Sequence, residues 1–263
     1  KTSFDSYLIN NLPRGCQYCI AGRKLVLFIT GKCTRACIYC PLSKKRKDSK
    51  LTLANEKECK NINEVIQEVI QSNAKGAGVT GGDPLEELNK TIKYATALKK
   101  KFGKKFHIHI YLSTHKITET ALKKLSKCVD EIRFHPMFAS KKTTEQENLE
   151  DLKKISQANK YFKKENLGIE VPLIPEKKKE ILDFIKKCSK YISFVNLNEY
   201  EIGDTNFRYM TMKYNFNETG YTVKKSIEAG KWILKNLEKT KLNIHLCTAD
   251  TKNWHQYKNR LKN

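Results

Sequence analysis

Short β-branched runs alternate with longer helical patterns along most of this chain. The predicted strands cover residues 25–30, 76–80, 106–112, 131–135, 168–173 and 194–200. Helical periodicity fills the intervals, as where Ile62, Val65 and Val69 share one helical face. Strands separated by helices pair in parallel through right-handed crossovers. Because six strands do not complete an eight-stranded closed barrel, the sequence predicts an α/β fold, a partial (βα)6 barrel with its active site at the carboxyl ends of the strands.

Signals at the ends of these elements predict further features. Asn55 and Glu58 have the spacing of a helix-capping box. Residues 206–222 break the alternation and are expected to form a loop or lid, before a helix over 223–239 and a short strand around 242–246. The expected division is an N-terminal metal knuckle (1–24), the barrel (25–205) and a C-terminal closing part (206–263).

The nine cysteines constrain the chemistry more than any other residue type. A chain of this length does not need disulfides to hold its core, and close cysteine pairs in a reducing compartment more often bind metal. No apolar run approaches the roughly 20 residues of a membrane span, and no signal-peptide pattern is present. We therefore expect a cytoplasmic protein without a membrane partner. Cys59, Cys128 and Cys188 are predicted to be packing residues on helices.

Three of the cysteines follow directly on the first strand, in the segment GKCTRACIYCPL (31–42). Cys33, Cys37 and Cys40 have the spacing to hold three corners of a [4Fe–4S] cluster, which leaves one iron without a protein ligand. A structural zinc site would need four closed ligands, and a ferredoxin would supply a fourth cysteine. The open iron predicts that a substrate or cofactor binds there.

The segment CTRACIYC resembles the signature of the radical S-adenosylmethionine (radical SAM) superfamily, including the aromatic Tyr39. The resemblance implies that SAM binds the open iron and is reductively cleaved to a 5′-deoxyadenosyl radical. It also implies an electron donor such as a ferredoxin or flavodoxin. Residues 12–43 are further similar to archaeal radical SAM proteins related to glycyl-radical-enzyme (pyruvate formate-lyase) activating enzymes, which suggests an archaeal protein.

The motif GGDP closes the second predicted strand and resembles the family motif that contacts the SAM amino group. Alone it would be an ordinary turn. Gly81 and Gly82 would let the backbone approach the ligand closely, whereas Asp83 replaces the usual glutamate. Tyr39 is assigned to SAM by the same resemblance.

Polar residues at the ends of the later strands are also predicted to contact SAM. Ser113 and Thr114 end the third strand and can bind the ribose or carboxylate of SAM. Arg133 and His135 share one face of the fourth strand, either in the pocket or as a structural pair. Glu170 resembles a ribose contact. On the sixth strand, one of two faces enters the pocket, either Asn196, Asn198 and Tyr200 or Glu199 and Glu201, and we select Asn198 as a contact.

A second metal site is predicted near the N-terminus. Cys16 and Cys19, followed by Gly22, have the pattern of a zinc knuckle, which supplies half a tetrahedral site. His245 and Cys247 lie two apart on a predicted strand and can supply the other half. Zinc is the expected metal, with a second iron–sulfur cluster or a non-metal cysteine pair as alternatives.

The charge balance favours a polyanionic partner. The net charge is +23, and residues 1–50 contain 11 basic and 2 acidic residues. Within this segment, Lys44, Lys45, Arg46 and Lys47 are predicted to contact nucleic acid. A lysine-rich surface adapted to heat or high salt is the alternative explanation.

Three functions follow as hypotheses. The first is a radical SAM enzyme that modifies RNA, specifically tRNA, and it rests on the basic excess. The second is a protein-modifying activase of the glycyl-radical-activating type, and it rests on the family resemblance. The third, of another class, is an RNA-binding module with a purely structural cluster, which would not cleave SAM.

Overall fold

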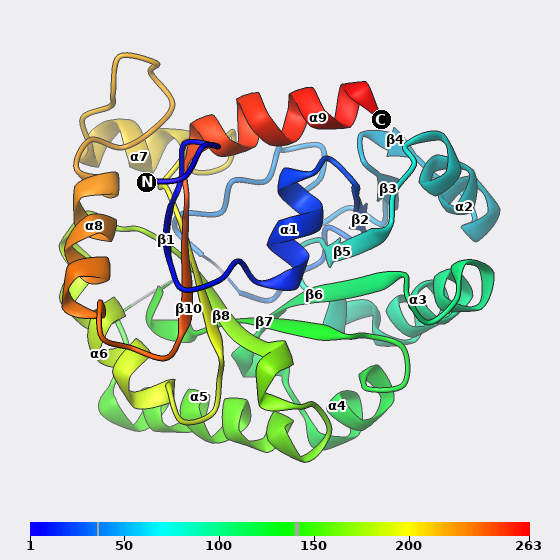
Figure 1. Cartoon of the computed structure of the whole chain (residues 1–263), viewed down its shortest axis with the longest axis horizontal. Coiled ribbons are helices and arrows are strands. Elements are labelled where there is room, and N and C mark those ends of the chain that lie inside the picture. Colours follow the sequence, from blue (N-terminus) through cyan, green and yellow to red (C-terminus); the bar gives the residue numbers. More distant parts are fainter. Residues whose placement is uncertain (36, 140–141) are drawn as a thin grey trace.

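The computed structural model describes residues 1–35, 37–139 and 142–263 (Figure 1). Within these ranges, one ten-stranded sheet has the order β1-β10-β9-β8-β7-β6-β5-β2-β3-β4. Its middle is parallel throughout. The parallel strands are β2 (Lys24–Phe28), β5 (Gly76–Thr80), β6 (His107–Ser113), β7 (Glu131–His135), β8 (Leu167–Pro172), β9 (Phe194–Asn198) and β10 (Asn243–Cys247). The six predicted strands are confirmed, and the predicted short C-terminal strand, β10, joins them as a further parallel strand.

Short antiparallel strands end the sheet on both sides. β1 (Tyr7–Ile9) pairs with β10, and the hairpin β3 (Leu53–Ala54) and β4 (Lys57–Glu58) pairs with β2. Within the described chain β1 and β4 are the two ends of the sheet order and do not pair with each other. The barrel is therefore open, as predicted.

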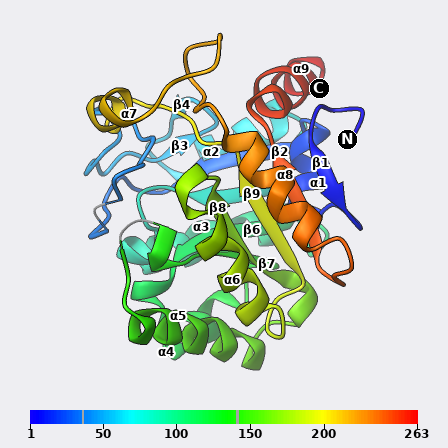
Figure 2. The same cartoon turned by 90° about the vertical axis from the view of Figure 1, so that its left-hand side faces the viewer.

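Helices cover the outer face of the curved sheet (Figures 1 and 2). They are α2 (Ile62–Gln71), α3 (Leu88–Phe102), α4 (Glu119–Leu125), α5 (Glu145–Gln157), α6 (Lys178–Cys188) and α8 (Ser226–Asn236). None of the helices in the described ranges has the length and apolar character that a membrane span requires.

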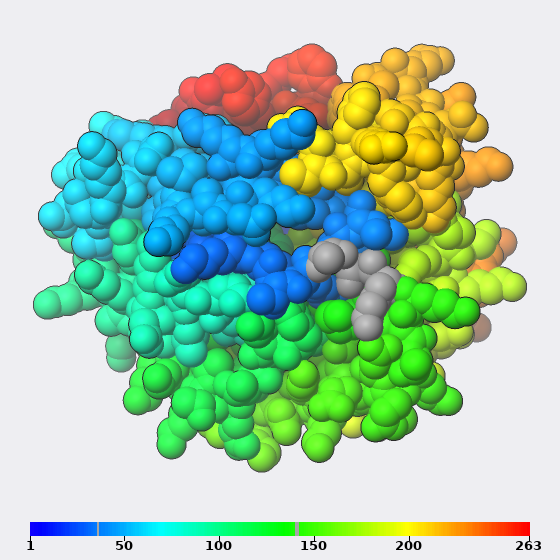
Figure 3. Space-filling view, turned by 180° about the vertical axis from the view of Figure 1, so that it is seen from behind, coloured from blue at the N-terminus to red at the C-terminus, as the bar shows by residue number. Residues whose placement is uncertain are grey.

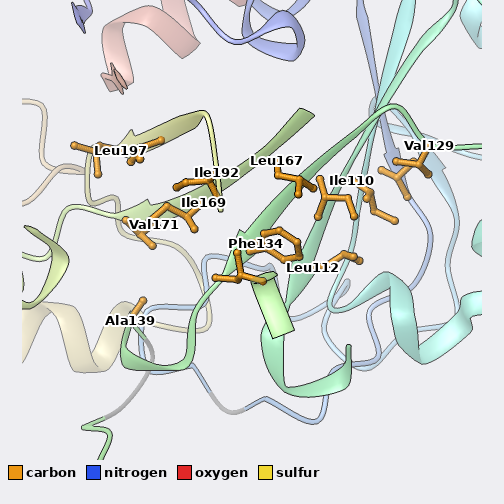
Figure 4. Close-up of a cluster of buried hydrophobic side chains, with 14 of the residues drawn as sticks. Ile110, Leu112, Val129, Phe134, Ala139, Leu167, Ile169, Val171, Ile192 and Leu197 are labelled. Carbon is orange, nitrogen blue, oxygen red and sulfur yellow. The ribbon is translucent and has the colours of Figure 1, made fainter. Parts of the chain in front are cut away.

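The two faces of the sheet differ in chemistry because side chains alternate along each strand. On β6, Ile108, Ile110 and Leu112 pack against the outer helices. Figure 4 shows this apolar layer with equivalent residues from β7, β8 and β9, such as Phe134 and Ile169. The opposite face carries polar side chains, and the register aligns them from strand to strand around the concave side.

A short helix, α1 (Arg14–Ile20), lies inside the curve of the sheet (Figure 1). The backbone N–H of Gly15 donates to Glu131 Oε2 at 3.1 Å, and Tyr18 stacks on His107 with ring centroids 5.6 Å apart. His107 is the first residue of β6, so α1 closes the barrel at the amino ends of the strands.

The end of the chain covers the open side of the barrel. A π-helix (Thr251–Gln256) continues into α9 (Tyr257–Lys262), which crosses the top of Figure 1. Asn259 Nδ2 donates to the carbonyl of Ile20 at 2.7 Å. A Cβ on Gly22 would collide with the backbone of Asn259 and Arg260. The C-terminal helices therefore hold α1 in place.

Some local predictions are wrong. Asn55 and Glu58 do not cap a helix: they belong to the β3–β4 hairpin, where Asn55 Oδ1 accepts from the N–H of Val26 at 3.1 Å. The cap of α2 is Asn61, whose side chain accepts from the N–H groups of Asn63 and Glu64. Asn55 hydrogen-bonds to the edge of β2, so the capping-box spacing of Asn55 and Glu58 did not mark the start of a helix.

The predicted lid and two of the predicted packing cysteines also need correction. Residues 206–222 are partly helical, because α7 (Phe207–Lys213) lies within them. Cys59 and Cys128 are buried as predicted, but neither lies on a helix: Cys59 precedes α2, and Cys128 lies in the turn after α4.

Candidate functional site

The three signature cysteines lie on one loop at the carboxyl ends of the strands. This loop, residues 31–42, is called the cluster loop below. Cys33, Cys37 and Cys40 are half-buried and line the mouth of a cavity of about 660 Å³. Figure 3 shows this face, where the blue cluster loop borders a hollow beside the yellow α7 segment. Among the described residues that line the cavity, no fourth cysteine is present, so the donor set fits a cluster with one open iron.

Polar contacts attach the cluster loop to the barrel on two sides. Arg35 Nη1 donates to the carbonyl of His135 at 2.5 Å, and Nη2 donates to the carbonyl of Pro136. On the other side, Asn206 Nδ2 donates to the carbonyl of Tyr39 at 3.1 Å, and Thr205 Oγ1 to that of Cys40 at 2.7 Å. The loop is thus held between the end of β7 and the start of α7.

Tyr39 and His135 form a pair whose protons the structure assigns. His135 Nδ1 lies 2.8 Å from the backbone carbonyl of Glu170, which can only accept, so Nδ1 carries the proton. The Tyr39 hydroxyl then donates to Nε2. Burial lowers the pKa of His135 to about 3, which keeps the ring neutral. Both residues line the cavity.

The glycines of GGDP pack against the cluster loop. Gly82 N donates to the carbonyl of Thr30 at 2.7 Å, and Asp83 N to that of Lys32 at 2.9 Å. A Cβ on Gly81 would collide with the carbonyl of Thr30, and one on Gly82 would lie 2.6 Å from that of Gly31. Both glycines line the cavity, but their lack of side chains is required by the backbone behind them.

Asp83 and Thr114 support the wall of the cavity without lining it. Asp83 accepts from the N–H of Leu85 at 3.0 Å and from the hydroxyl of Ser113. Burial raises the pKa of Asp83. Thr114 Oγ1 donates to the carbonyl of His135 at 3.4 Å. Of the predicted pair Ser113 and Thr114, only Ser113 lines the cavity.

A buried ion network crosses the cavity below these residues. Arg133 donates to Glu131 Oε1 at 2.8 Å and to Glu170 Oε2 at 2.8 Å. Glu170 also accepts from Asn198 Nδ2 at 2.8 Å. Burial alone would raise the pKa of Glu170, but the Arg133 guanidinium and these hydrogen bonds lower it. Arg133, Glu170 and Asn198 line the cavity, and Arg133 also takes part in structural ion pairs. Beyond the end of β9, Glu199, Tyr200 and Glu201 line it too.

The predicted zinc ligands take part in hydrogen bonds of their own. Cys16 Sγ lies 3.3 Å from Arg133 Nη2, and Cys19 Sγ lies 2.8 Å from Gln256 Oε1. Gln256 also reaches Cys247 Sγ at 3.8 Å, and His245 Nδ1 lies 2.9 Å from Asn196 Oδ1. Within the described ranges, no three His, Cys, Asp or Glu side chains gather closely enough to hold a single metal ion. The structure gives the zinc prediction no support.

The predicted nucleic-acid contacts lie on a turn beside the cavity mouth. Lys44, Lys45 and Lys47 are exposed, and Lys47 lines the cavity. Arg46 pairs with Glu56. Within the same basic segment, Arg35 is buried in the contacts described above, and Lys32 pairs with Glu87. Part of the basic excess is therefore internal.

The sequence did not predict three of the cavity's polar residues, Lys24, Tyr111 and Lys252. Tyr111 had a signal, because it shares the polar face of β6 with His107 and His109. Lys252 Nζ pairs with Glu201 Oε1 at 2.6 Å and comes from the C-terminal π-helix. Its placement depends on tertiary structure that no local pattern reports.

Comparisons with known proteins agree with this geometry. Residues 27–197 match the family model described as the Radical SAM superfamily. A protein of Methanocaldococcus jannaschii, named as a candidate glycyl-radical enzyme activating enzyme, is 37% identical over 267 residues, which cover 98% of this chain and 70% of that protein.

Solved structures show the fold. Methylornithine synthase (PylB) aligns with a TM-score of 0.54 and 10% identity over 84% of this chain. Native anSMEcpe with bound AdoMet and Cp18Cys peptide aligns with a TM-score of 0.47 and 17% identity over 82% of it. The chain spans 63% and 58% of the lengths of these two proteins. The family model covers more than half of the chain, and the cysteine loop lies at the mouth of the cavity. The chain therefore belongs to the radical SAM superfamily, and it is an enzyme whose family cofactors are a [4Fe–4S] cluster and S-adenosylmethionine.

Proposed function

We propose that this enzyme uses radical SAM chemistry to remove a hydrogen atom from a protein substrate, in the manner of an activase. The observation that carries the proposal is the 37% identity to a candidate glycyl-radical enzyme activating enzyme along 98% of this chain. Of the functions that the sequence suggested, this relative favours the protein-modifying alternative over tRNA modification.

The cavity suits that chemistry because different groups of its residues have different roles. When bound, the cluster and SAM supply a 5′-deoxyadenosyl radical. Cys33, Cys37 and Cys40 would hold the cluster at the mouth. Tyr39 and His135 would fix the loop through a neutral hydrogen bond. The residues that would face SAM are Gly81, Gly82, Ser113, Glu170 and Asn198.

The substrate class can be tested without knowing the substrate. Reconstituted enzyme with a chemical reductant is given an extract of the cells that produce it, and 5′-deoxyadenosine is measured. We expect the extract to stimulate its formation, and protease treatment of the extract to remove the stimulation. Matched samples treated with ribonuclease should keep it. Stimulation lost only to ribonuclease would contradict the proposal.

RNA modification is the second candidate, because the exposed Lys44, Lys45 and Lys47 lie beside the mouth of the cavity. These charges suit a phosphate backbone, and they equally suit an acidic electron donor such as a ferredoxin or flavodoxin. Mass spectrometry of tRNA nucleosides from cells with and without the gene separates these uses. A nucleoside lost with the gene would favour RNA.

A zinc ion at Cys16, Cys19, His245 and Cys247 is not part of the proposed catalysis, because its predicted ligands are engaged elsewhere. The prediction itself can be tested by elemental analysis. A variant with Cys33, Cys37 and Cys40 all changed to Ala removes the iron site, so any zinc that remains belongs to the second site. A folded variant without zinc would refute the prediction.

A further inference from the structure

Lys24 places a buried ammonium group at the floor of the cavity. It is the first residue of β2, and the register sets Val26 opposite Gly78 on β5. A Cβ on Gly78 would lie 3.3 Å from Lys24 Cε and 2.7 Å from His109 Nε2. The glycine therefore leaves room for the lysine side chain to cross β5 and reach β6. Lys24 is 8% exposed, and it lines the cavity.

The ammonium group contacts a neutral acceptor instead of a carboxylate. In the described part of the chain, Lys24 Nζ has its hydrogen bond with His109 Nε2, at 3.3 Å, and no ion pair. Burial and the charges of Lys24 and Arg133 hold the pKa of His109 well below its usual value, so the ring is neutral. A buried cation without a counter-ion is strongly unfavourable unless a ligand supplies one.

Tyr111 adds a second donor to the same acceptor. Its hydroxyl also lies 3.3 Å from His109 Nε2, which offers a single lone pair. Burial raises the pKa of Tyr111 to about 12, so the hydroxyl keeps its proton. Lys24 and Tyr111 therefore offer more hydrogen-bond donors than the single lone pair of His109 Nε2 can accept. The surplus donors belong to two residues that both line the cavity.

Three of the four acidic residues that line the cavity have partners, and the fourth, Asp48, is exposed. Glu170 accepts from Arg133 and Asn198, and Glu201 pairs with Lys252. Glu199 accepts from the N–H of Ala249 at 2.8 Å. None of these contacts neutralises Lys24.

The neighbouring thiols contact other side chains. Cys16 Sγ lies 3.3 Å from Arg133 Nη2. Cys19 Sγ lies 2.8 Å from Gln256 Oε1.

We propose that Lys24 and Tyr111 bind a carboxylate group of the substrate at the floor of the cavity. A carboxylate offers two oxygens to these two donors and supplies the missing counter-charge. Lys24 lies at the start of the five-residue β2, roughly 13 Å below the strand end, so the anchored substrate extends towards the cluster loop. The carboxylate is either that of a small acid or that of an Asp or Glu side chain in a protein. The inference rests on the proposed function in taking this cavity as the site of radical chemistry.

Binding to the reconstituted holoenzyme tests the proposal with defined probes. Calorimetry compares succinate with succinamide, and acetyl-Gly-Asp-Gly-amide with its Asn counterpart. We expect the acid of one pair to bind more tightly than its amide, and the pair that discriminates identifies the source of the carboxylate. Lys24→Met should weaken that acid by about 10–100-fold, Tyr111→Phe by less, and Lys24→Arg should retain most of the affinity. Equal binding of both acids by wild type and Lys24→Met would overturn the proposal.

Thermal unfolding without any probe gives an independent test. Because the substitution breaks no ion pair of Lys24, Lys24→Met should not lower Tm. Lys99 serves as the matched control: it pairs with Asp130 at 2.5 Å, so Lys99→Met should lower Tm. A lower Tm and lost metal in Lys24→Met would show that the ammonium balances a metal–thiolate centre, and would overturn the proposal. Failure of the proposed function is seen separately, as wild-type enzyme that forms no 5′-deoxyadenosine.

Discussion

At the scale of single residues, three of the cysteines are set apart by lining the cavity mouth. Changing Cys33, Cys37 or Cys40 to Ala should reduce the iron content from about four per chain and abolish reductive SAM cleavage, because each thiolate holds one corner of the cluster. Iron analysis and 5′-deoxyadenosine measurement check this. Cys128→Ala, at a buried position away from the cavity, is the control and should keep both. Formation of 5′-deoxyadenosine by all three variants would refute the assignment.

His135 should make the protein sensitive to acid. Its pKa is about 3 when folded, against about 6.5 when unfolded, so between these values the unfolded state binds more protons. Stability is therefore fully present above pH 6.5 and falls as the pH is lowered towards 3. His135→Gln should lose this dependence, which is on the order of a few kcal/mol.

Urea denaturation at pH 7 and pH 4 measures the effect of His135→Gln. His255→Gln is the control, because His255 is partly exposed and pairs with Asp5 near the surface. Parallel pH curves for wild type and His135→Gln would show that another group is responsible.

The residue types of the site were more predictable than their partners. The spacing of the cysteines and the position of GGDP after a strand are local patterns, so the sequence carried them. Whether Arg133 faces a substrate or Glu131 depends on strand register and on α1, which lies over it. The role of Lys24 could not be predicted for the same reason, because its lack of a counter-ion depends on residues that are distant in the sequence.

At the scale of elements, α1 is fitted tightly against the polar face of the sheet. A Cβ on Gly15 would lie 2.6 Å from Arg133 Nη2 and 2.8 Å from Glu131 Oε1, and against His109 Nδ1. Gly15→Ala should therefore destabilise the protein by about 1–3 kcal/mol, although alanine normally favours a helix by about 1 kcal/mol. Chemical denaturation measures the change.

Arg14→Ala is the matched control for this prediction, because Arg14 is exposed on the same helix. The free energy of unfolding of Arg14→Ala should stay within about 0.5 kcal/mol of the wild-type value. A Gly15→Ala variant more stable than wild type would mean that α1 sits more loosely than the contacts indicate.

The long elements were predictable and the short ones were not. Period-two alternation and β-branched residues marked the six central strands. The two-residue strands β3 and β4 are too short to carry such a period. The sequence of α1, RGCQYCI, has no apolar stripe because it packs against polar residues, and its cysteine spacing favoured a metal knuckle instead.

At the scale of the whole molecule, the net charge of +23 should produce salt-dependent binding to tRNA whatever the natural substrate is. Reversing Lys44, Lys45 and Lys47 to Glu should weaken that binding. Reversing the exposed Lys100, Lys101 and Lys104 changes the net charge by the same amount far along the chain. We expect both variants to lose tRNA affinity to a similar extent, because the electrostatic field of the whole surface attracts the RNA.

Filter-binding titrations at several salt concentrations compare the two charge-reversed variants. If tRNA affinity falls only when Lys44, Lys45 and Lys47 are reversed, an RNA docking site lies beside the cavity mouth. That result would favour tRNA modification over the proposed protein substrate.

The helix α1, which closes the barrel at the amino ends of the strands, also bears on the order in which substrate and SAM bind. With that end closed, molecules reach the floor of the cavity past the cluster loop, and SAM belongs at that loop. If SAM binds at that loop, we expect a group that binds Lys24 to enter before SAM and to leave after the products of SAM. In that order of binding, SAM would help to keep the substrate carboxylate at Lys24 while the radical exists.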